Sequence, residues 1–178
     1  DDHALSVWLN EHIWPAEKKF VSPQFVSDGS RLAMVEMLKG GITTFNDMYF
    51  YPQSTAEVAT EIGMRANIGL VVLDFPTNYA NDPQDYLNKG FNFRDEWRNN
   101  SLISSSIAPH APYSVSDAAF KLITTYAEQL QMTIHTHLHE TSAEIKESMQ
   151  NFNMSPIQRL DLLGVLGPNL MAAHCVHL

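Results

Sequence analysis

The sequence predicts an α/β fold, and within that class part of a (β/α)8 barrel. Short apolar or β-branched runs alternate with amphipathic stretches along most of the chain, and Gly, Pro, Asn or Asp marks each change. An ionisable side chain follows each expected strand. Strands that alternate with helices imply right-handed crossovers and a mostly parallel sheet. We therefore expect one domain over residues 1–178.

Two helices are expected before the first strand. Apolar residues recur at helical spacing over residues 4–13 and again over residues 23–39. Gly40 and Gly41 follow the second run, and such a pair stops a helix. The first strand therefore begins after residue 41.

Five strands and four helices follow. The strands are expected at residues 42–46, 65–73, 102–108, 132–138 and 169–173, where short apolar runs lie between turn signals. The helices are expected at residues 53–62, 83–98, 116–130 and 142–163. Gly90 predicts a break in the second of these helices, and Pro156 predicts one in the last.

The residues after the strands distinguish between two parallel architectures. A barrel builds its active site from all its strand ends, whereas a doubly wound sheet binds its ligand at one switch point. In this chain the strand ends carry Asp47, Asp74, His110, His137 with Glu140, and His174. No GxGxxG or GxxxxGK[ST] phosphate-binding motif is present. These observations favour the barrel.

The predicted barrel is incomplete. A full barrel has eight strands and typically about 250 residues, so this chain holds about strands 2 to 6. It stops just past a buried strand, which would leave an unpaired sheet edge. We expect a fragment of a longer protein, with exposed edges that are covered in the longer chain or that pair with a second copy in a homo-oligomer.

Composition narrows the classes of partner and compartment. The chain is 44% apolar and 17% charged, which is typical of a globular protein. Its net charge of −9 and the absence of a basic run argue against nucleic acid and anionic membranes as partners. A single cysteine predicts a reducing compartment, and no apolar run is long enough for a membrane span. We expect a cytoplasmic protein that acts on a small molecule.

Residues 133–141, TIHTHLHET, place histidines at 135, 137 and 139 and a glutamate at 140. Residues two apart in a strand share a face, so all three imidazoles would point into the barrel if the strand reached residue 139. Neutral imidazole is a common zinc ligand, and an acid beside it can move a proton. For any one of the three histidines alone, a hydrogen-bonded core residue is the better interpretation.

Two further strand ends carry candidate groups. His110 lies between Pro109 and Pro112, which fix the backbone around it; the alternative is a turn histidine in solvent. His174 ends the last strand, and Cys175 beside it is expected to be a small buried residue. Asp47 is expected to cap the next helix or turn.

Five ordered segments carry a resemblance to a known family. They are residues 13–17 (IWPAE), 41–49 (GITTFNDMY), 109–113 (PHAPY), 137–141 (HLHET) and 173–178 (AHCVHL). Together they resemble the amidohydrolase superfamily. Within it they look most like the 5-methylthioadenosine/S-adenosylhomocysteine deaminases, close to the guanine deaminases and triazine hydrolases.

The resemblance implies an activity and a role for individual residues. The implied reaction is metal-dependent hydrolytic deamination of the adenine ring of S-adenosylhomocysteine, methylthioadenosine or a related adenosine, with one divalent ion, Zn²⁺ in the first instance. The implied roles are metal ligand for His137, proton shuttle for Glu140, support of the hydrolytic water and the intermediate for His174, ribose binding for Glu17, purine binding for His110 and pocket wall for Trp8.

The chain also departs from the family pattern. The first-strand HxH ligand pair, the last-strand aspartate and the small β-sandwich domain are missing, so we expect this fragment alone to bind metal weakly and to be inactive. The segment His135-Thr136-His137 lies downstream of the Trp-Pro-x-Glu motif and is not that HxH pair. Three alternatives stay open: a guanine or 8-oxoguanine deaminase, a chlorotriazine hydrolase, and a catalytically incomplete barrel that acts only in binding or assembly.

Overall fold

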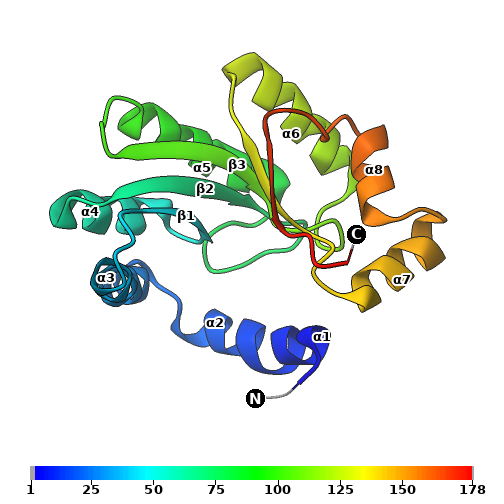
Figure 1. Cartoon of the computed structure of the whole chain (residues 1–178), viewed down its shortest axis with the longest axis horizontal. Coiled ribbons are helices and arrows are strands. Elements are labelled where there is room, and N and C mark those ends of the chain that lie inside the picture. The colour runs from blue at the N-terminus through cyan, green and yellow to red at the C-terminus, as the bar shows by residue number, and fades with distance from the viewer. Residues whose placement is uncertain (1–2, 178) are drawn as a thin grey trace.

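The computed structural model describes residues 3–177, so both ends of the predicted domain lie outside it. Its five strands are β1 (Thr44–Tyr49), β2 (Arg65–Val72), β3 (Ile103–Pro109), β4 (Ile134–Leu138) and β5 (Leu170–His174). Every neighbouring pair is parallel, and the strands lie in the sheet in chain order. A doubly wound sheet reverses its order at a switch point. The uninterrupted order is that of a barrel, as predicted (Figure 1).

The sheet is curled. The side-chain amide of Asn46 in β1 lies 3.1 Å from Sδ of Met171 in β5, although three strands separate β1 from β5. Between them, the amide of Asn67 donates to Oγ of Ser106 at 3.1 Å. These side chains point to the inner face, which is unusually polar because barrel interiors are commonly filled by Val, Ile and Leu.

The helices surround the outer face and the strand ends. They are α1 (Leu5–Val7), the π-helical turn η1 (Trp8–Ile13), α2 (Trp14–Phe20), α3 (Pro23–Lys39), α4 (Pro52–Ile62), α5 (Pro83–Trp97), α6 (Asp117–Leu130), α7 (Ser142–Phe152) and α8 (Pro156–Leu162). In Figure 1, α2 and α1 run along the bottom of the view, and the α1 end lies below α7; residues of α1, η1 and α7 line one cavity. In the described part of the chain, none of the helices is long and apolar enough to cross a membrane.

All five predicted strands and most helices are confirmed, with two differences at the amino-terminal end. The first helical segment continues to Phe20, beyond the predicted end at residue 13. The wide turn of η1 precedes Pro15, which lies in the first turn of α2, where its missing N–H costs no hydrogen bond. Strand β1 begins two residues later than predicted and runs on to Tyr49.

The predicted break at Gly90 is wrong, whereas the break before Pro156 is confirmed. Helix α5 is continuous through Gly90 because the glycine is a packing residue: a Cβ there would lie 3.0 Å from Cβ of Leu70 in β2. Helix α7 ends at Phe152, and Asn153 then takes a left-handed conformation with φ 53°. Helix α8 starts afresh at Pro156.

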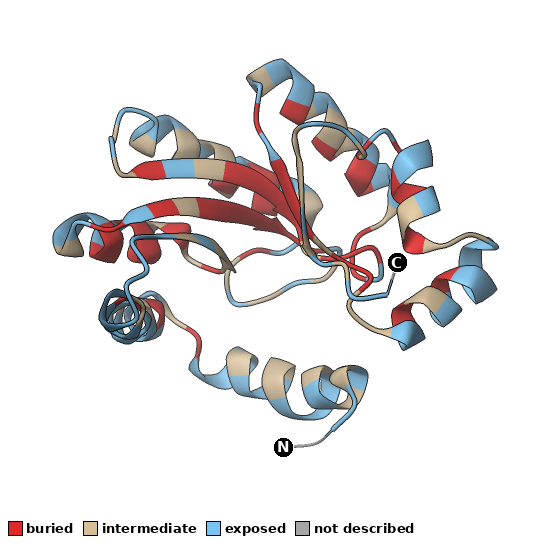
Figure 2. Ribbon diagram, viewed as in Figure 1, coloured by how far each residue is buried: buried red, intermediate tan, exposed pale blue. Residues whose placement is uncertain are grey.

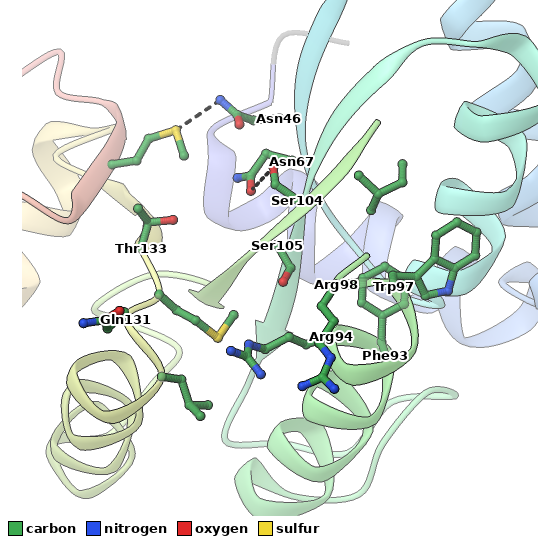
Figure 3. Close-up of a pocket in the computed structure, with 14 residues that line it drawn as sticks. Asn46, Asn67, Phe93, Arg94, Trp97, Arg98, Ser104, Ser105, Gln131 and Thr133 are labelled. Atoms are coloured by element: carbon green, nitrogen blue, oxygen red, sulfur yellow. Dashed lines mark hydrogen bonds between the residues drawn. The ribbon is translucent and has the colours of Figure 1, made fainter. Parts of the chain in front are cut away.

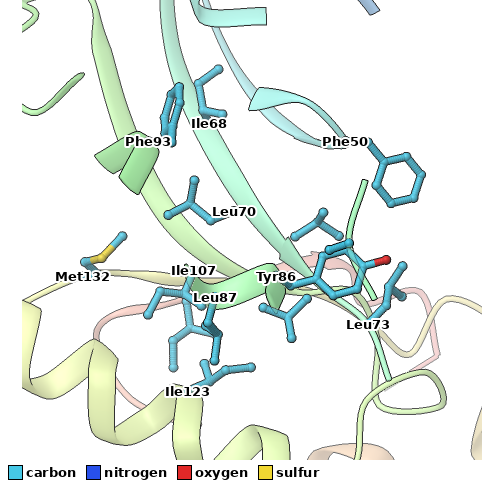
Figure 4. Packing of buried hydrophobic residues seen from close by; sticks show 14 of the residues in the cluster. Phe50, Ile68, Leu70, Leu73, Tyr86, Leu87, Phe93, Ile107, Ile123 and Met132 are labelled. Carbon is cyan, nitrogen blue, oxygen red and sulfur yellow. The ribbon is translucent and has the colours of Figure 1, made fainter. Parts of the chain in front are cut away.

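The core lies between the sheet and helices α4 to α6. Alternate residues of β2 point outward, and Ile68, Leu70 and Val72 are almost completely buried there. Helices α4 and α5 pack against β2 and α6 packs against β3, and Tyr86 from α5 and Ile123 from α6 belong to the same buried cluster (Figure 4). Figure 2 shows buried residues gathered on β2, β3 and β4, whereas β1 and β5, the edges of this sheet, are mostly intermediate or exposed. Within the described residues the two edges are therefore open, as the sequence predicts.

A cavity of about 560 Å³ lies at the amino-terminal ends of the strands (Figure 3). Asn67, Ser104 and Thr133 line it from the sheet, and Arg94 and Arg98 line it from the end of α5. It is at the opposite end of the strands from the predicted histidines and Glu140. Active sites of barrels lie at the carboxyl ends, so its size does not make it the candidate site.

Candidate active site

The carboxyl ends of the strands meet the N-terminal helices at a cavity of about 110 Å³. Three predicted site residues line it together: Glu17 from α2, His110 directly after β3, and His137 in β4. Met48, Tyr49, Val71 and Leu73 line it from β1 and the end of β2, and the other lining residues are Leu9, Ile13, Trp14 and Phe50. The fold thus brings together residues that lie up to 120 positions apart in the sequence.

Three imidazoles stand side by side on consecutive strand ends. The ring centroids of His110 and His137 are 5.0 Å apart, and those of His137 and His174 are 5.2 Å apart. Adjacent parallel strands lie about 4.8 Å apart, so this spacing follows directly from placing one histidine at the end of each of β3, β4 and β5. His137 is the central ring of the three.

Hydrogen bonds at Nδ1 fix the tautomers of His137 and His110. Nδ1 of His137 lies 2.8 Å from the carbonyl oxygen of His110, and a carbonyl accepts only, so Nδ1 carries the proton. Nε2 of His137 therefore keeps its lone pair. Oγ of Ser114 donates to the carbonyl of Ala111 at 3.2 Å and so accepts from Nδ1 of His110 at 2.8 Å. Nε2 of His110 is likewise an acceptor.

Burial keeps these imidazoles neutral. It lowers the pKa of His110 to about 4, with a smaller contribution from the neighbouring His137. Burial also lowers the pKa of His137, against the opposing effect of its hydrogen bond to the His110 carbonyl. Desolvation disfavours the charged form of a base. Both rings are therefore unprotonated at neutral pH, which is the form that binds a metal or accepts a hydrogen bond.

Glu140 faces His174 across the ends of β4 and β5. Oε1 of Glu140 lies 3.5 Å from Nε2 of His174. Both side chains are partly exposed, at 24% and 38%, and so remain accessible to a bound molecule. A carboxylate and an imidazole at this distance can pass a proton to a common substrate atom or share one.

Glu17 is held by a residue that the sequence interpretation did not assign to the site. The hydroxyl of Tyr49 donates to Oε1 of Glu17 at 2.8 Å. Burial raises the pKa of the Glu17 carboxyl, and the hydrogen bond from Tyr49 lowers it in part. Tyr49 lies in the GITTFNDMY segment, but only the fold shows that its hydroxyl points at α2. The alternation of residues along a strand does not predict this contact between Tyr49 and Glu17.

Trp8 lies outside the lining of this cavity. The residue is 43% exposed, and Trp14, six residues further along the same helical segment, lines the cavity instead. Trp14 and Glu17 also border a neighbouring, more apolar cavity of about 350 Å³, together with Phe50 and Phe75. The assignment of Trp8 as a pocket wall stays a prediction.

The other two histidines of TIHTHLHET are buried in the fold. His135 is 7% exposed inside the sheet, and His139 is 4% exposed. Strand β4 ends at Leu138, and His139 has a left-handed backbone with φ 53°, so it does not share the face of His137. Its Nε2 accepts from the backbone N–H of Ile157 at 3.3 Å. Both are buried, as the core interpretation predicts, but among the described residues Nδ1 of each ring has no hydrogen-bond partner.

Asp47 and Asp74 turn away from the cavity. Burial raises the pKa of the Asp47 carboxyl, which a hydrogen bond with Thr55 of α4 partly offsets. Asp74 accepts from the backbone N–H of Ser116 at 2.9 Å, directly before α6. Asp74 therefore ties the end of β2 to the start of α6. Asp47 lies within β1, and the N-cap residue of α4 is Tyr51 with no side-chain cap, so Asp47 does not cap the next helix as predicted.

Arg159 anchors the loop that carries His110, and its sequence context in an amphipathic helix offers no sign of this. Its guanidinium is buried and donates to the carbonyls of Pro112 and Val115 and to Oδ1 of Asp117. A fork of donors suits several acceptors at once. The segment between β3 and α6 is thereby fixed to α8.

The residues present suit one ligand position of a metal site. His137 offers an unprotonated Nε2 whose orientation is set by a hydrogen bond at Nδ1, the arrangement usual for histidine ligands. Over residues 3–177, no group of three or more His, Cys, Asp or Glu side chains is placed to hold a metal ion. The described residues therefore fit a divalent ion through His137 but do not enclose one.

Histidines and an acid at the carboxyl ends of a parallel barrel are typical of hydrolases that bind a divalent metal. The sequence profile of the Amidohydrolase family matches residues 2–178. This chain belongs to the amidohydrolase family. It is 49% identical over 98% of its length to a 5-methylthioadenosine/S-adenosylhomocysteine deaminase from Saccharophagus degradans, and 44% identical over its whole length to one from Teredinibacter turnerae.

Solved structures agree on the fold. The crystal structure of an adenosine deaminase from Xanthomonas campestris with bound zinc matches the whole chain with a TM-score of 0.97 at 43% identity. A guanine deaminase from C. acetobutylicum matches 99% of the chain with a TM-score of 0.86 at 21% identity, which shows the fold alone. The chain spans 39% and 40% of the length of the two curated relatives and 40% of the zinc-bound structure. The partial barrel is therefore confirmed.

Proposed function

We propose that the protein containing this chain hydrolyses the adenine ring of S-adenosylhomocysteine, methylthioadenosine or a related adenosine and releases ammonia. The observation that carries the proposal is the arrangement of Glu140 and His174, 3.5 Å apart, beside the unprotonated Nε2 of His137. The similarity to deaminases that act on such nucleosides supports the same reaction.

The proposed metal ligand in this chain is His137, and the ion is a single divalent metal, Zn²⁺ in the first instance. When bound, such an ion lowers the pKa of a water ligand toward neutrality and so supplies a nucleophile. The remaining ligands lie outside this chain in the proposal, as the family resemblance implies. A zinc ion is present in the similar adenosine deaminase structure, which supports the choice of metal.

Glu140 is the proposed proton shuttle. Its carboxylate takes one proton from the attacking water and gives it to a ring nitrogen of adenine, where it stays in the product. It then takes the second proton of that water, from the new hydroxyl on the ring carbon, and gives it to the amino group, which leaves as ammonia. His174 lies next to the same carboxylate and supports the charge that develops at the reacting ring carbon. Proton transfer by a positioned side chain commonly contributes 10²- to 10⁴-fold to a rate. Adenine becomes hypoxanthine.

Glu17, His110 and Trp8 are proposed to hold the substrate. A carboxylate accepts hydrogen bonds from both hydroxyls of a ribose, and Tyr49 holds that of Glu17 in place. Nε2 of His110 is an acceptor that suits an N–H of the purine. The partner is thus a small purine nucleoside rather than a nucleic acid or membrane, and we propose that the protein acts in the cytoplasm.

Release of ammonia tests this function. The intact protein, loaded with metal or stripped of it, is incubated with S-adenosylhomocysteine, methylthioadenosine, adenosine, guanine and a chlorotriazine. Metal-dependent ammonia release from the adenine nucleosides is expected. Release only from guanine would point to the guanine deaminase alternative, and chloride release from a chlorotriazine would point to the hydrolase alternative. No metal-dependent turnover of any of them would contradict the proposal.

A further inference from the structure

The carboxylate of Glu144 is buried and binds main chain rather than a charged partner. The residue is only 7% exposed. Its Oε1 accepts from the backbone N–H of His139 at 3.2 Å, and its Oε2 accepts from the backbone N–H of Glu140 at 2.9 Å. One side chain thus holds two consecutive amides of the turn between β4 and α7.

This arrangement differs from ordinary helix capping. In a capping box the third helical residue reaches back to the N–H of the N-cap residue itself, as Gln158 does to Ser155 in α8, at 2.9 Å. In α7 the N-cap is Thr141, whose hydroxyl accepts from the N–H of Glu144. The Glu144 carboxylate reaches past Thr141 to residues outside the helix. It therefore restrains the turn as well as the helix.

The same turn supports both proposed proton-handling groups. The carbonyl of His139 accepts from the backbone N–H groups of Val176 and His177, at 3.0 and 3.2 Å, and so carries the segment that follows His174. Glu140 is the next residue along the turn. A displaced turn would therefore move the Glu140 carboxylate and the segment next to His174 together.

Only a carboxylate can make both contacts. A glutamine of the same shape has one acceptor oxygen, and its amide group would place a donor against a backbone N–H. In a buried site the unpaired N–H is costly, so the turn is expected to shift when the carboxylate is replaced.

We propose that Glu144 is a positioning residue. By accepting hydrogen bonds from two backbone N–H groups of the β4–α7 turn, it holds Glu140 in place against His174. This inference rests on the proposed function for Glu140 and His174. Glu144 itself is not proposed to touch the substrate. Its effect on the reaction passes through the backbone of residues 139 and 140.

The test compares Glu144→Gln with Gln158→Ala in the intact, metal-loaded protein. Both changes remove a side-chain acceptor from the start of a helix, but only Glu144 reaches the turn. For Glu144→Gln we expect kcat to fall by about 10- to 100-fold, the order expected of a misplaced catalytic group, with KM and bound metal nearly unchanged. Gln158→Ala should lower the unfolding temperature without changing kcat.

Amide hydrogen exchange gives a second readout that needs no substrate. Faster exchange at residues 139–140 and 176–177 in Glu144→Gln, with α7 still protected, is the expected result. If the wild-type protein releases no ammonia, the proposed deaminase function fails, but these amides still decide whether Glu144 holds the turn. If their protection is unchanged, the proposal is wrong.

Three further outcomes would also overturn it. A Glu144→Gln protein that is less stable but keeps full kcat would show that Glu144 is only a helix cap. A loss of metal in proportion to the loss of kcat would show that it acts on His137 instead. If Glu144→Gln does not fold, Glu144→Asp keeps the charge but draws the carboxylate back by one methylene, and full kcat in that variant would contradict the proposal.

Discussion

The carbonyl oxygen of His110 accepts two hydrogen bonds from His137, one from the backbone N–H at 3.0 Å and one from Nδ1 at 2.8 Å. The first continues the parallel pairing of β3 and β4 one residue past the end of β3. The second fixes the tautomer of the imidazole. Strand pairing and ligand orientation therefore depend on the same carbonyl, and the position of Nε2 is set by the sheet rather than by a mobile side chain.

Replacement of His137 should reduce metal binding. In His137→Ala the Nε2 ligand is lost while the main-chain hydrogen bond to His110 remains, so the sheet should stay intact. Loss of a residue that only hydrogen-bonds to a metal ligand lowers metal affinity or activity about 10- to 100-fold. Loss of the ligand itself should therefore lower metal affinity at least about tenfold and abolish turnover. Metal analysis of the purified intact protein measures this. His3→Ala, at an exposed position near the amino terminus, is the control and should keep its metal.

Replacement of Glu140 should separate turnover from metal binding. Glu140→Gln keeps the size of the side chain but cannot carry the proton, so kcat should fall by about 10²- to 10⁴-fold. Metal content should stay nearly the same because Glu140 is not a proposed ligand. Glu128→Gln, an exposed change on α6, should match the wild-type protein in both assays. Metal loss in Glu140→Gln would mean that its role is that of a ligand.

Tyr49 should matter for substrates that carry ribose. Tyr49→Phe removes the donor to Glu17, which leaves a partly buried carboxylate without that hydrogen bond. A hydrogen bond to a charged group contributes about 1.5–3 kcal/mol, so we expect kcat/KM for adenosine to fall roughly 10- to 100-fold. Metal content should not change, and Tyr126→Phe on α6 should behave like the wild-type protein. An unchanged kcat/KM for adenosine would contradict ribose binding by Glu17.

Acid should destabilise the metal-free protein below about pH 6.5. The pKa of His110 is near 6.5 in the unfolded chain and about 4 in the fold, chiefly because the ring is buried. Above pH 6.5 the ring is neutral in both states. Between pH 6.5 and 4 only the unfolded chain binds the proton, so the free energy of unfolding falls by about 1.4 kcal/mol per pH unit, about 3 kcal/mol in all.

The pH dependence can be assigned by mutation. Urea unfolding of the metal-free protein at pH 7 and pH 5 should show a lower midpoint at pH 5, and His110→Asn should reduce the difference. Part of the difference should remain, because burial also lowers the pKa of His135 and His137. Equal midpoints at the two pH values in the wild-type protein would show that the fold does not hold these rings neutral.

The sequence predicted the parts of the site that depend on strand order, and missed those that depend on packing. Strand ends of a parallel barrel must meet at one edge, so His110, His137 and His174 could be placed together from their positions alone. The contacts of Tyr49 with Glu17 and of Arg159 with the loop after β3 join segments far apart in the chain. Periodicity describes one element at a time and carries no information about such pairs.

Glu144 is an intermediate case. The spacing Thr141-x-x-Glu144 is that of a capping box, so the start of α7 was readable from the sequence. The reach of the carboxylate beyond the N-cap to residues 139 and 140 was not, because it depends on the left-handed turn at His139. A non-glycine residue with positive φ has no reliable sequence signal.

Gly90 and Gly29 form a matched pair of helix-interior glycines with opposite expected effects. A Cβ at Gly29 in α3 would meet no atom within 4 Å, so Gly29→Ala should raise the free energy of unfolding by about 0.5–1 kcal/mol through helix propensity alone. A Cβ at Gly90 in α5 would lie 3.0 Å from Cβ of Leu70, in the core of the sheet. Overpacking of a buried site costs about 1–3 kcal/mol, so Gly90→Ala should lower the stability despite the same gain in propensity. Thermal unfolding of the two variants of the intact protein beside the wild-type protein measures both signs. A stabilised Gly90→Ala would show that Gly90 marks a weak point of α5, as its sequence first indicates, rather than a close helix–strand contact.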